Sequence, residues 1–264
     1  MTTNRQFSLA LEALLELNAD VVSPSLRPKP VVAAPTLEGV LSEIGSLPRE
    51  ALFLGMALDG LPVLLNLRDS APGPLLITGD AGAGKTSFLQ MVAQAVQQTH
   101  HPQDVQFGVI TSFPDEWEKI PVTDHFISVF SAHHNSAQDF LLSVASWAHA
   151  NKSRQTMLLL IDDLEILTKM DAEALQNFRW LMMRGPSHRA WPIVTMNADR
   201  YGQSLLWIPM FRTRIFGKIE KPHIAAAVGA DQASALDRLE PRIQFAMREY
   251  ESWLRFWLPS CSNS

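Results

Sequence analysis

Cysteine is almost absent from this chain of 264 residues, because Cys261 is the single one. No disulfide can form within the chain, and this use of cysteine is typical of reducing compartments, so we expect a cytoplasmic protein. No apolar run approaches the roughly 20 residues that a transmembrane helix needs. The N-terminus also lacks the basic-then-apolar pattern of a signal peptide. We therefore expect no insertion into a membrane.

The chain also lacks a large excess of charge of either sign. The chain has 22 Lys and Arg against 27 Asp and Glu, a net charge of −5. This is not the balance of a strongly basic nucleic-acid binder, although a local basic surface is compatible with it. The histidine pairs at 100–101 and 133–134 lack cysteine or carboxylate neighbours at zinc-like spacing, so we expect no zinc site there. With 47% hydrophobic residues, the chain can fill one large α/β domain with a small appendage.

A phosphate-binding motif is the most specific feature that is present. The segment reads Gly79, Asp80, Ala81, Gly82, Ala83, Gly84, Lys85, Thr86 and Ser87. Its first eight residues, 79–86, match the pattern G-x-x-x-x-G-K-[ST] between an apolar run and a helical apolar pattern, which is the strand–loop–helix context that the motif requires. Backbone N–H groups and the helix N-terminus would bind nucleotide phosphates, with Lys85 reaching the β- and γ-phosphates and Thr86 binding Mg²⁺. The motif predicts ATP and Mg²⁺ as ligands.

A second motif follows at residues 157–163. A continuous apolar run ends in Asp162 and Asp163, as a parallel strand buried on both faces would. Carboxylates at the carboxyl end of such a strand lie where open α/β sheets bind their ligands. Asp162 is therefore expected to hold Mg²⁺ through water, together with Thr86.

The rest of the chain alternates strand and helix patterns. Two patterns beside Asp59-Gly60, at 51–56 and 61–67, predict a hairpin. The segment 112–125, which includes Trp117, is expected to be a surface excursion. Further strands are expected over 105–111, 126–130, 191–197 and 211–219, and helices over 36–44, 136–150 and 171–184.

The two ends of the chain have their own patterns. Residues 7–17 are apolar at helical spacing, and residues 23–35 contain four prolines, which favours an extended linker. We expect residues 1–48 to be an N-terminal helix and linker, and residues 49–264 to be the ATPase domain. Near the C-terminus, alternating apolar residues at 243–247 and 254–258 predict a β-hairpin, with a single amphipathic helix as the alternative.

The order of these features resembles the FtsK/HerA class of motor ATPases, in particular the FtsK-type domains of DNA translocases and type VII secretion ATPases. The lead-in strands, the phosphate loop, the acidic strand end, the Thr213-Arg214-Ile215 strand and the closing tail occur in the family's order over residues 49–259. The resemblance implies an α/β P-loop NTPase fold of the RecA/FtsK type. Its central sheet would be mainly parallel and flanked by helices.

The resemblance also implies catalytic roles. The residue after Asp162 is a glutamate in the family and polarises the attacking water, but this chain has Asp163. Aspartate is one methylene shorter, and a misplacement of about 1 Å can cost a hundredfold in rate. We expect slow hydrolysis or a compensating loop shift, with Glu165 as a less favoured substitute. Asn197 occupies the sensor position, where its amide orients water or contacts the γ-phosphate, or alternatively caps the next turn.

Ring ATPases of this class complete the site with an arginine from the neighbouring subunit, which stabilises the charge of the transition state. Arg184 and Arg214 are the preferred candidates here, with Arg189 ranked just below them. Arg184 alternatively interacts with the helix dipole, and Arg214 alternatively occupies a solvated strand position. The resemblance thus implies a homo-oligomeric ring.

The leading interpretation is an FtsK-like motor that hydrolyses Mg-ATP and acts on duplex DNA. A weakly hydrolysing, nucleotide-switched scaffold is one alternative, which Asp163 favours. A subunit of a protein-export ATPase, with a protein partner, is the other.

Overall fold

The computed structural model describes residues 35–249 and 251–261. The helix expected over residues 7–17 and nearly all of the linker expected over 23–35 lie outside the described residues. A domain boundary near residue 49 stays a prediction. No helix within the described residues is both long and apolar enough to cross a bilayer.

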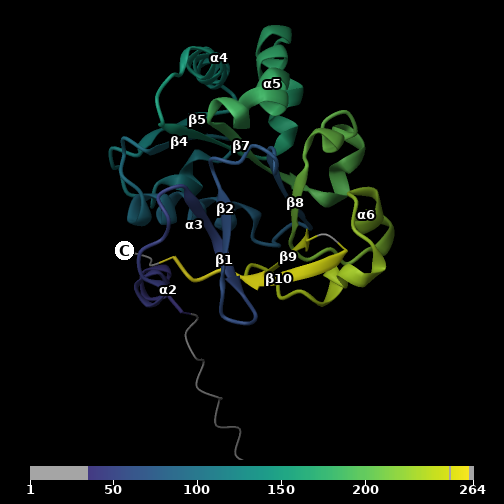
Figure 1. Cartoon of the computed structure of the whole chain (residues 1–264). Coiled ribbons are helices and arrows are strands. Elements are labelled where there is room, and N and C mark those ends of the chain that lie inside the picture. The colour runs from purple at the N-terminus through teal and green to yellow at the C-terminus, as the bar shows by residue number, and fades with distance from the viewer. Residues whose placement is uncertain (1–34, 250, 262–264) are drawn as a thin grey trace, which may run out of the picture. The chain divides into compact units, whose positions relative to one another are not determined.

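One sheet organises the described chain, in the strand order β2-β1-β10-β9-β8-β3-β7-β6-β4-β5 (Figure 1). Its strands are β1 (Ala51–Ala57), β2 (Pro62–Asn66), β3 (Leu75–Gly79), β4 (Val105–Thr111), β5 (Phe126–Ser131), β6 (Thr156–Asp162), β7 (Ala190–Asn197), β8 (Thr213–Phe216), β9 (Gln244–Glu249) and β10 (Ser252–Trp257). The strands from β8 to β5 in this order pair in parallel, and the remaining four pair antiparallel. The predicted α/β fold with a mainly parallel sheet is confirmed.

Helices cover both faces of this sheet. They are α2 (Leu37–Ile44), α3 (Lys85–Thr99), α4 (Asn135–Ala150), α5 (Ala172–Arg184) and α6 (Pro222–Ala227). The caps that the sequence predicts are present, since the Thr36 side chain accepts a hydrogen bond from the N–H of Gly39 and that of Asp171 from the N–H of Ala174. These caps fix where α2 and α5 begin.

The core divides into two clusters because successive strand residues point to opposite faces of the sheet. Leu75 and Ile77 of β3 pack with α3 in one cluster, whereas Leu76 between them packs in the other cluster with α4 and α5. Leu158 and Leu159 of β6 divide in the same way. The central strands are therefore apolar on both faces, as the unbroken runs in the sequence predict.

The structure decides between two predictions for the C-terminal segment and corrects the prediction for residues 112–125. The C-terminal segment forms the hairpin β9–β10, so the alternative of a single helix is wrong. The segment 112–125 is not only a surface excursion. The 3-10 helix η1 (Pro114–Trp117) buries the ring of Trp117, with 1% of it exposed, in the same cluster as α3. This segment is consequently part of the wall beside β6.

Candidate active site

The phosphate loop joins β3 to α3 through a tight backbone turn. Gly84 has φ +95°, and a Cβ placed there would lie 2.5 Å from the Cα of Arg242. A side chain at this position is therefore excluded both by backbone strain and by the C-terminal segment. No side chain caps α3, which leaves its first N–H groups available to an anion.

Lys85 is held over this loop by backbone oxygens. Its ammonium group donates to the carbonyls of Gly79 at 3.1 Å and of Asp80 at 2.8 Å. Burial lowers the pKa of Lys85, while the charges of Asp162 and Asp163 oppose that shift. A partly buried cation with neutral partners would gain from an anionic phosphate in the pocket.

Asp162, at the end of β6, is hydrogen-bonded to two threonine hydroxyls. Its Oδ1 accepts hydrogen bonds from Thr86 at 3.2 Å and from Thr195 at 2.9 Å. Burial raises the pKa of Asp162, and the hydrogen bonds from Thr195 and Thr86 act in the opposite direction. The indole N–H of Trp117 makes no hydrogen bond of normal geometry among the described residues. Because a hydroxyl and a carboxylate meet here beside Lys85, the residues fit the Mg²⁺ ion of a bound nucleotide.

Hydrogen bonds engage the backbone N–H and one carboxylate oxygen of Asp163. It has φ +94°, which is uncommon for a residue with a side chain. Its backbone N–H donates to the hydroxyl of Thr195 at 2.8 Å, and its Oδ1 accepts from the N–H of Glu165 at 3.1 Å. Asp163 thereby caps the 3-10 helix η2 (Leu164–Lys169). Glu165, the substitute considered from the sequence, forms an ion pair with Arg200 instead.

A pocket of ≈ 750 Å³ brings most of the predicted residues together. Nine of them line it: Ala81, Gly82, Gly84, Lys85, Thr86, Ser87, Asp162, Asp163 and Asn197. The loop residues outside the lining are Gly79, Asp80 and Ala83. The Asp80 side chain accepts a hydrogen bond from the N–H of Glu220, and a Cβ on Gly79 would lie 2.9 Å from the Cβ of Ala83. The size and lining suit a nucleotide.

Sequence reasoning missed the other lining residues, Gln90, Phe113, Asp115, Glu116, Lys119, Thr195 and Arg242. Thr195 had a signal, because it is a polar residue inside an apolar strand and points to the same face as Asn197. Arg242 had none. Its backbone N–H donates to the carbonyl of Ala83 at 2.9 Å, which places the start of the C-terminal hairpin against the phosphate loop.

The candidate arginines do not line this pocket. Arg214 directs its guanidinium at backbone carbonyls of Phe211 (3.3 Å), Val228 (3.1 Å) and Ile208 (3.0 Å), and burial lowers its pKa. Arg184 is exposed at the end of α5. An arginine that acts on a neighbouring subunit need not lie near its own pocket, so the proposed role of both stays a prediction.

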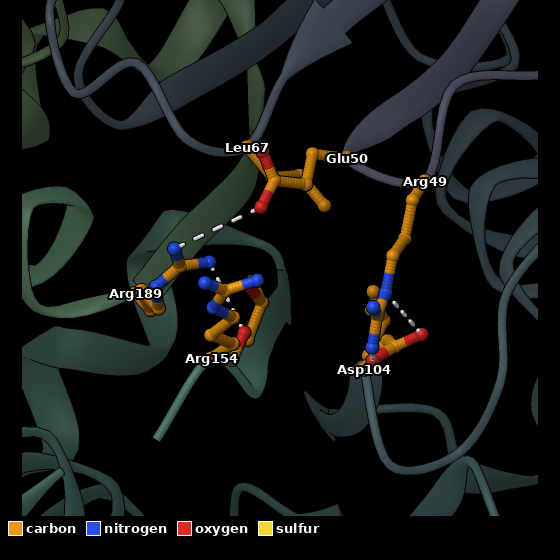
Figure 2. A pocket seen from close by; sticks show the side chains of 8 residues that line it. Arg49, Glu50, Leu67, Asp104, Arg154 and Arg189 are labelled. Atoms are coloured by element: carbon orange, nitrogen blue, oxygen red, sulfur yellow. Dashed lines mark hydrogen bonds and ion pairs between the residues drawn. The ribbon is translucent and has the colours of Figure 1, made fainter. Parts of the chain in front are cut away.

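Arg189 lies just before β7, at the amino ends of the parallel strands, whereas the nucleotide pocket lies at their carboxyl ends. It approaches Glu50 at 3.9 Å and donates to the carbonyl of Arg154 at 3.1 Å. Figure 2 shows these side chains near the pair of Arg49 with Asp104, in a second pocket of ≈ 30 Å³. That space holds about one water molecule, so we assign no ligand to it.

Comparison with known proteins supports the fold reading. The model of the NACHT domain matches residues 73–197, which span the phosphate loop and β7. No curated protein matches the chain.

Solved structures resemble most of the chain. The cytoplasmic domain of the type VII secretion ATPase EccC from Thermomonospora curvata has a TM-score of 0.66 and 16% identity, covering 88% of this chain and 28% of that one. The conjugation coupling protein TcpA of pCW3 with ATPγS has a TM-score of 0.59 and 13% identity, covering 80% and 66%. The genome packaging NTPase B204 of Sulfolobus turreted icosahedral virus 2 with AMPPCP has a TM-score of 0.55 and 10% identity, covering 72% and 98%.

These likenesses establish the fold. The chain has the same α/β fold as these solved structures, which is the fold that the resemblance in its sequence predicts. It corresponds to about a quarter of the EccC chain, 28% of its length.

Proposed function

We propose that this chain binds and hydrolyses Mg-ATP as a subunit of a ring-shaped motor in the cytoplasm. The observation that carries the proposal is the meeting of Lys85, Thr86 and Asp162 in one pocket, with the two side chains of Thr86 and Asp162 3.2 Å apart. Relatives in the fold were solved with ATPγS and AMPPCP, which supports an adenine nucleotide as the ligand.

Each residue has a distinct part in this proposal. The loop N–H groups and Lys85 bind the phosphates, and Thr86 and Asp162 hold Mg²⁺. The metal ion would neutralise charge on the β- and γ-phosphates when bound. Thr195 fixes the Asp162 carboxylate, and Asn197 orients the attacking water or contacts the γ-phosphate. An arginine of a neighbouring subunit, Arg184 or Arg214, completes the site.

Duplex DNA is the mechanical substrate that we propose. A conjugation coupling protein and a genome packaging NTPase share the fold, which supports this choice by analogy only. The test is steady-state hydrolysis of Mg-ATP with and without linear duplex DNA, with Lys85→Ala as the blank. We expect DNA to stimulate turnover and the stimulation to fall as salt rises.

A nucleotide-switched scaffold is the second candidate. The observation that favours it is the cap that Asp163 forms on η2, because this carboxylate is engaged where the family has its glutamate. Tight binding with negligible turnover, and growth of oligomers on adding ATP, would support the scaffold. Stimulation by a peptide rather than by DNA would support the export subunit, a role suggested by the secretion ATPase with the same fold.

A further inference from the structure

The proposed hydrolysis needs a carboxylate that polarises water, and the side chain at the expected position is one methylene shorter than glutamate and has one oxygen engaged. Asp163 uses its Oδ1 to cap η2 and its backbone N–H to bind Thr195. Glu165 pairs with Arg200 and does not line the nucleotide pocket. Asp162 is bonded to two threonines and is the proposed Mg²⁺ ligand.

Another carboxylate, that of Glu116, lines the same pocket. β4 runs beside β6, and Thr111 at its end pairs in register with Asp162. The chain then turns into η1, so Glu116 follows a strand end that is adjacent to the metal-binding strand end. Glu116 lines the pocket together with Lys85, Thr86 and Asp162.

The backbone around Glu116 is fixed on both sides. The side-chain amide of Gln90, on α3, donates to the carbonyl of Glu116 at 2.7 Å. The next residue, Trp117, is buried in the core cluster that includes α3. The bond from Gln90 therefore ties the backbone of Glu116 to the helix that follows the phosphate loop.

We propose that Glu116 orients and deprotonates the water that attacks the γ-phosphate, in place of the glutamate missing at position 163. This inference rests on the proposed ATP hydrolysis. The water oxygen bonds to the γ-phosphorus while the bond from that phosphorus to the β–γ bridging oxygen breaks. The electron pair of that bond leaves on ADP. The water proton passes to the Glu116 carboxylate and from there to phosphate or solvent.

The electrostatics of the pocket agree with this role. Burial and, next, the charge of Asp162 raise the pKa of Glu116, so Glu116 is close enough to Asp162 to be affected by its charge. Asp115 also lines the pocket, but its side chain is shorter and its backbone carbonyl accepts a local hydrogen bond from Glu118 rather than one from α3. Glu116 is therefore the better placed of the two.

Three variants of the full chain test the proposal. Glu116→Gln removes the base, and Asp163→Asn removes the carboxylate charge at 163 while keeping an N-cap residue. Glu118→Gln is the matched control, since Glu118 is exposed in the same segment and does not line the pocket. We expect Glu116→Gln to slow single-turnover hydrolysis by about a hundredfold or more. Asp163→Asn should slow hydrolysis much less than Glu116→Gln does, and Glu118→Gln should match the wild type.

Equilibrium binding gives a readout that does not depend on turnover. A carboxylate that faces the γ-phosphate repels ATP but not ADP, so Glu116→Gln should raise the affinity for AMPPCP relative to ADP by about threefold or more. Glu118→Gln should leave that ratio unchanged.

The outcomes separate the two proposals. Three results would each overturn the role of Glu116. Glu116→Gln could hydrolyse ATP as fast as the wild type, or it could leave the ratio of AMPPCP to ADP affinity unchanged. The third result is that Asp163→Asn alone loses turnover. A wild type that hydrolyses no faster than Lys85→Ala overturns the proposed hydrolysis itself, and the role of Glu116 with it.

Discussion

The hydroxyl of Thr195 donates a hydrogen bond of 2.9 Å to the Oδ1 of Asp162. The same hydroxyl accepts the backbone N–H of Asp163 at 2.8 Å. One side chain on β7 thus fixes both acidic residues at the end of β6. These two hydrogen bonds tie β7 to the carboxyl end of β6.

Replacing Thr195 by valine tests that link. Hydrogen bonds to charged groups contribute about 1.5–3 kcal/mol, and Thr195→Val removes one from Asp162. We expect the affinity for ADP to fall by about tenfold or more when Mg²⁺ is present. The fall should be smaller in EDTA, because Asp162 acts through the metal. Isothermal titration under both conditions measures the difference.

Thr78→Val is the matched control for this experiment. Thr78 is a buried threonine on the adjacent strand β3, and its hydroxyl has no hydrogen-bond partner among the described residues. Its replacement should leave Mg-ADP affinity unchanged and keep or raise stability. Equal losses of affinity in both variants would mean that general packing, not the bond to Asp162, is responsible.

The charge of Lys85 should have opposite effects on stability with and without nucleotide. Burial disfavours this cation in the free protein, so Lys85→Met should melt at least as high as the wild type when no ligand is present. Nucleotide at 100 times its Kd should stabilise the wild type by about 2.7 kcal/mol and leave Lys85→Met unaffected. Thermal unfolding with and without Mg-ADP measures both effects. A nucleotide-induced shift retained by the variant would contradict the role of Lys85.

Arg214 is expected to contribute to stability through its bonds to backbone carbonyls. Arg214→Met removes three hydrogen bonds to backbone carbonyls, which should cost about 2–3 kcal/mol of unfolding free energy. Arg179→Met, at an exposed position on α5, is the control and should change stability little. Urea unfolding measures the difference.

Gly229→Ala probes the same contact without removing the arginine. A Cβ on Gly229 would lie 2.2 Å from the Nη1 of Arg214, at a residue with φ +96°, so this variant should also be destabilised. A lower turnover number in Arg214→Met with unchanged stability would instead indicate a role in a neighbouring active site.

Cys261 should react slowly with thiol reagents. Burial raises the pKa of its thiol to about 11. At pH 8 the thiolate fraction is then about a hundredfold below that of an ordinary cysteine, and alkylation should be slower by a similar factor. The rate should rise about tenfold per pH unit until the pH approaches the pKa. Reaction in denaturant provides the reference, and equal rates in folded and unfolded protein would contradict the burial of the thiol.

Local patterns in the sequence predicted the elements and the phosphate site. β4 has the bounds 105–111 that its apolar run predicts, and Asp171 caps α5 as expected, because such signals depend on a few adjacent residues. The Lys85, Thr86 and Asp162 arrangement followed from two motifs at the carboxyl ends of parallel strands.

Non-local contacts account for what the sequence could not predict. Glu116 and Arg242 carry no distinguishing pattern, and only tertiary structure brings them to the pocket. Arg214 alternates within its strand like a solvated residue, yet its guanidinium binds carbonyls that come from three separate positions. The pattern of the tail predicted a hairpin, but a local pattern does not determine which strands it pairs with.

The place of that hairpin sets the order in which the protein can be completed on the ribosome. β10, the last strand, pairs with β1, the first, and β9 pairs with β8 (Figure 1). A nascent chain therefore exposes one edge of β1 and one edge of β8 until its final strands emerge. The contact of Arg242 with Ala83 forms at the same late stage. Chains that end before β9 thus carry open strand edges on β1 and β8, which favour aggregation.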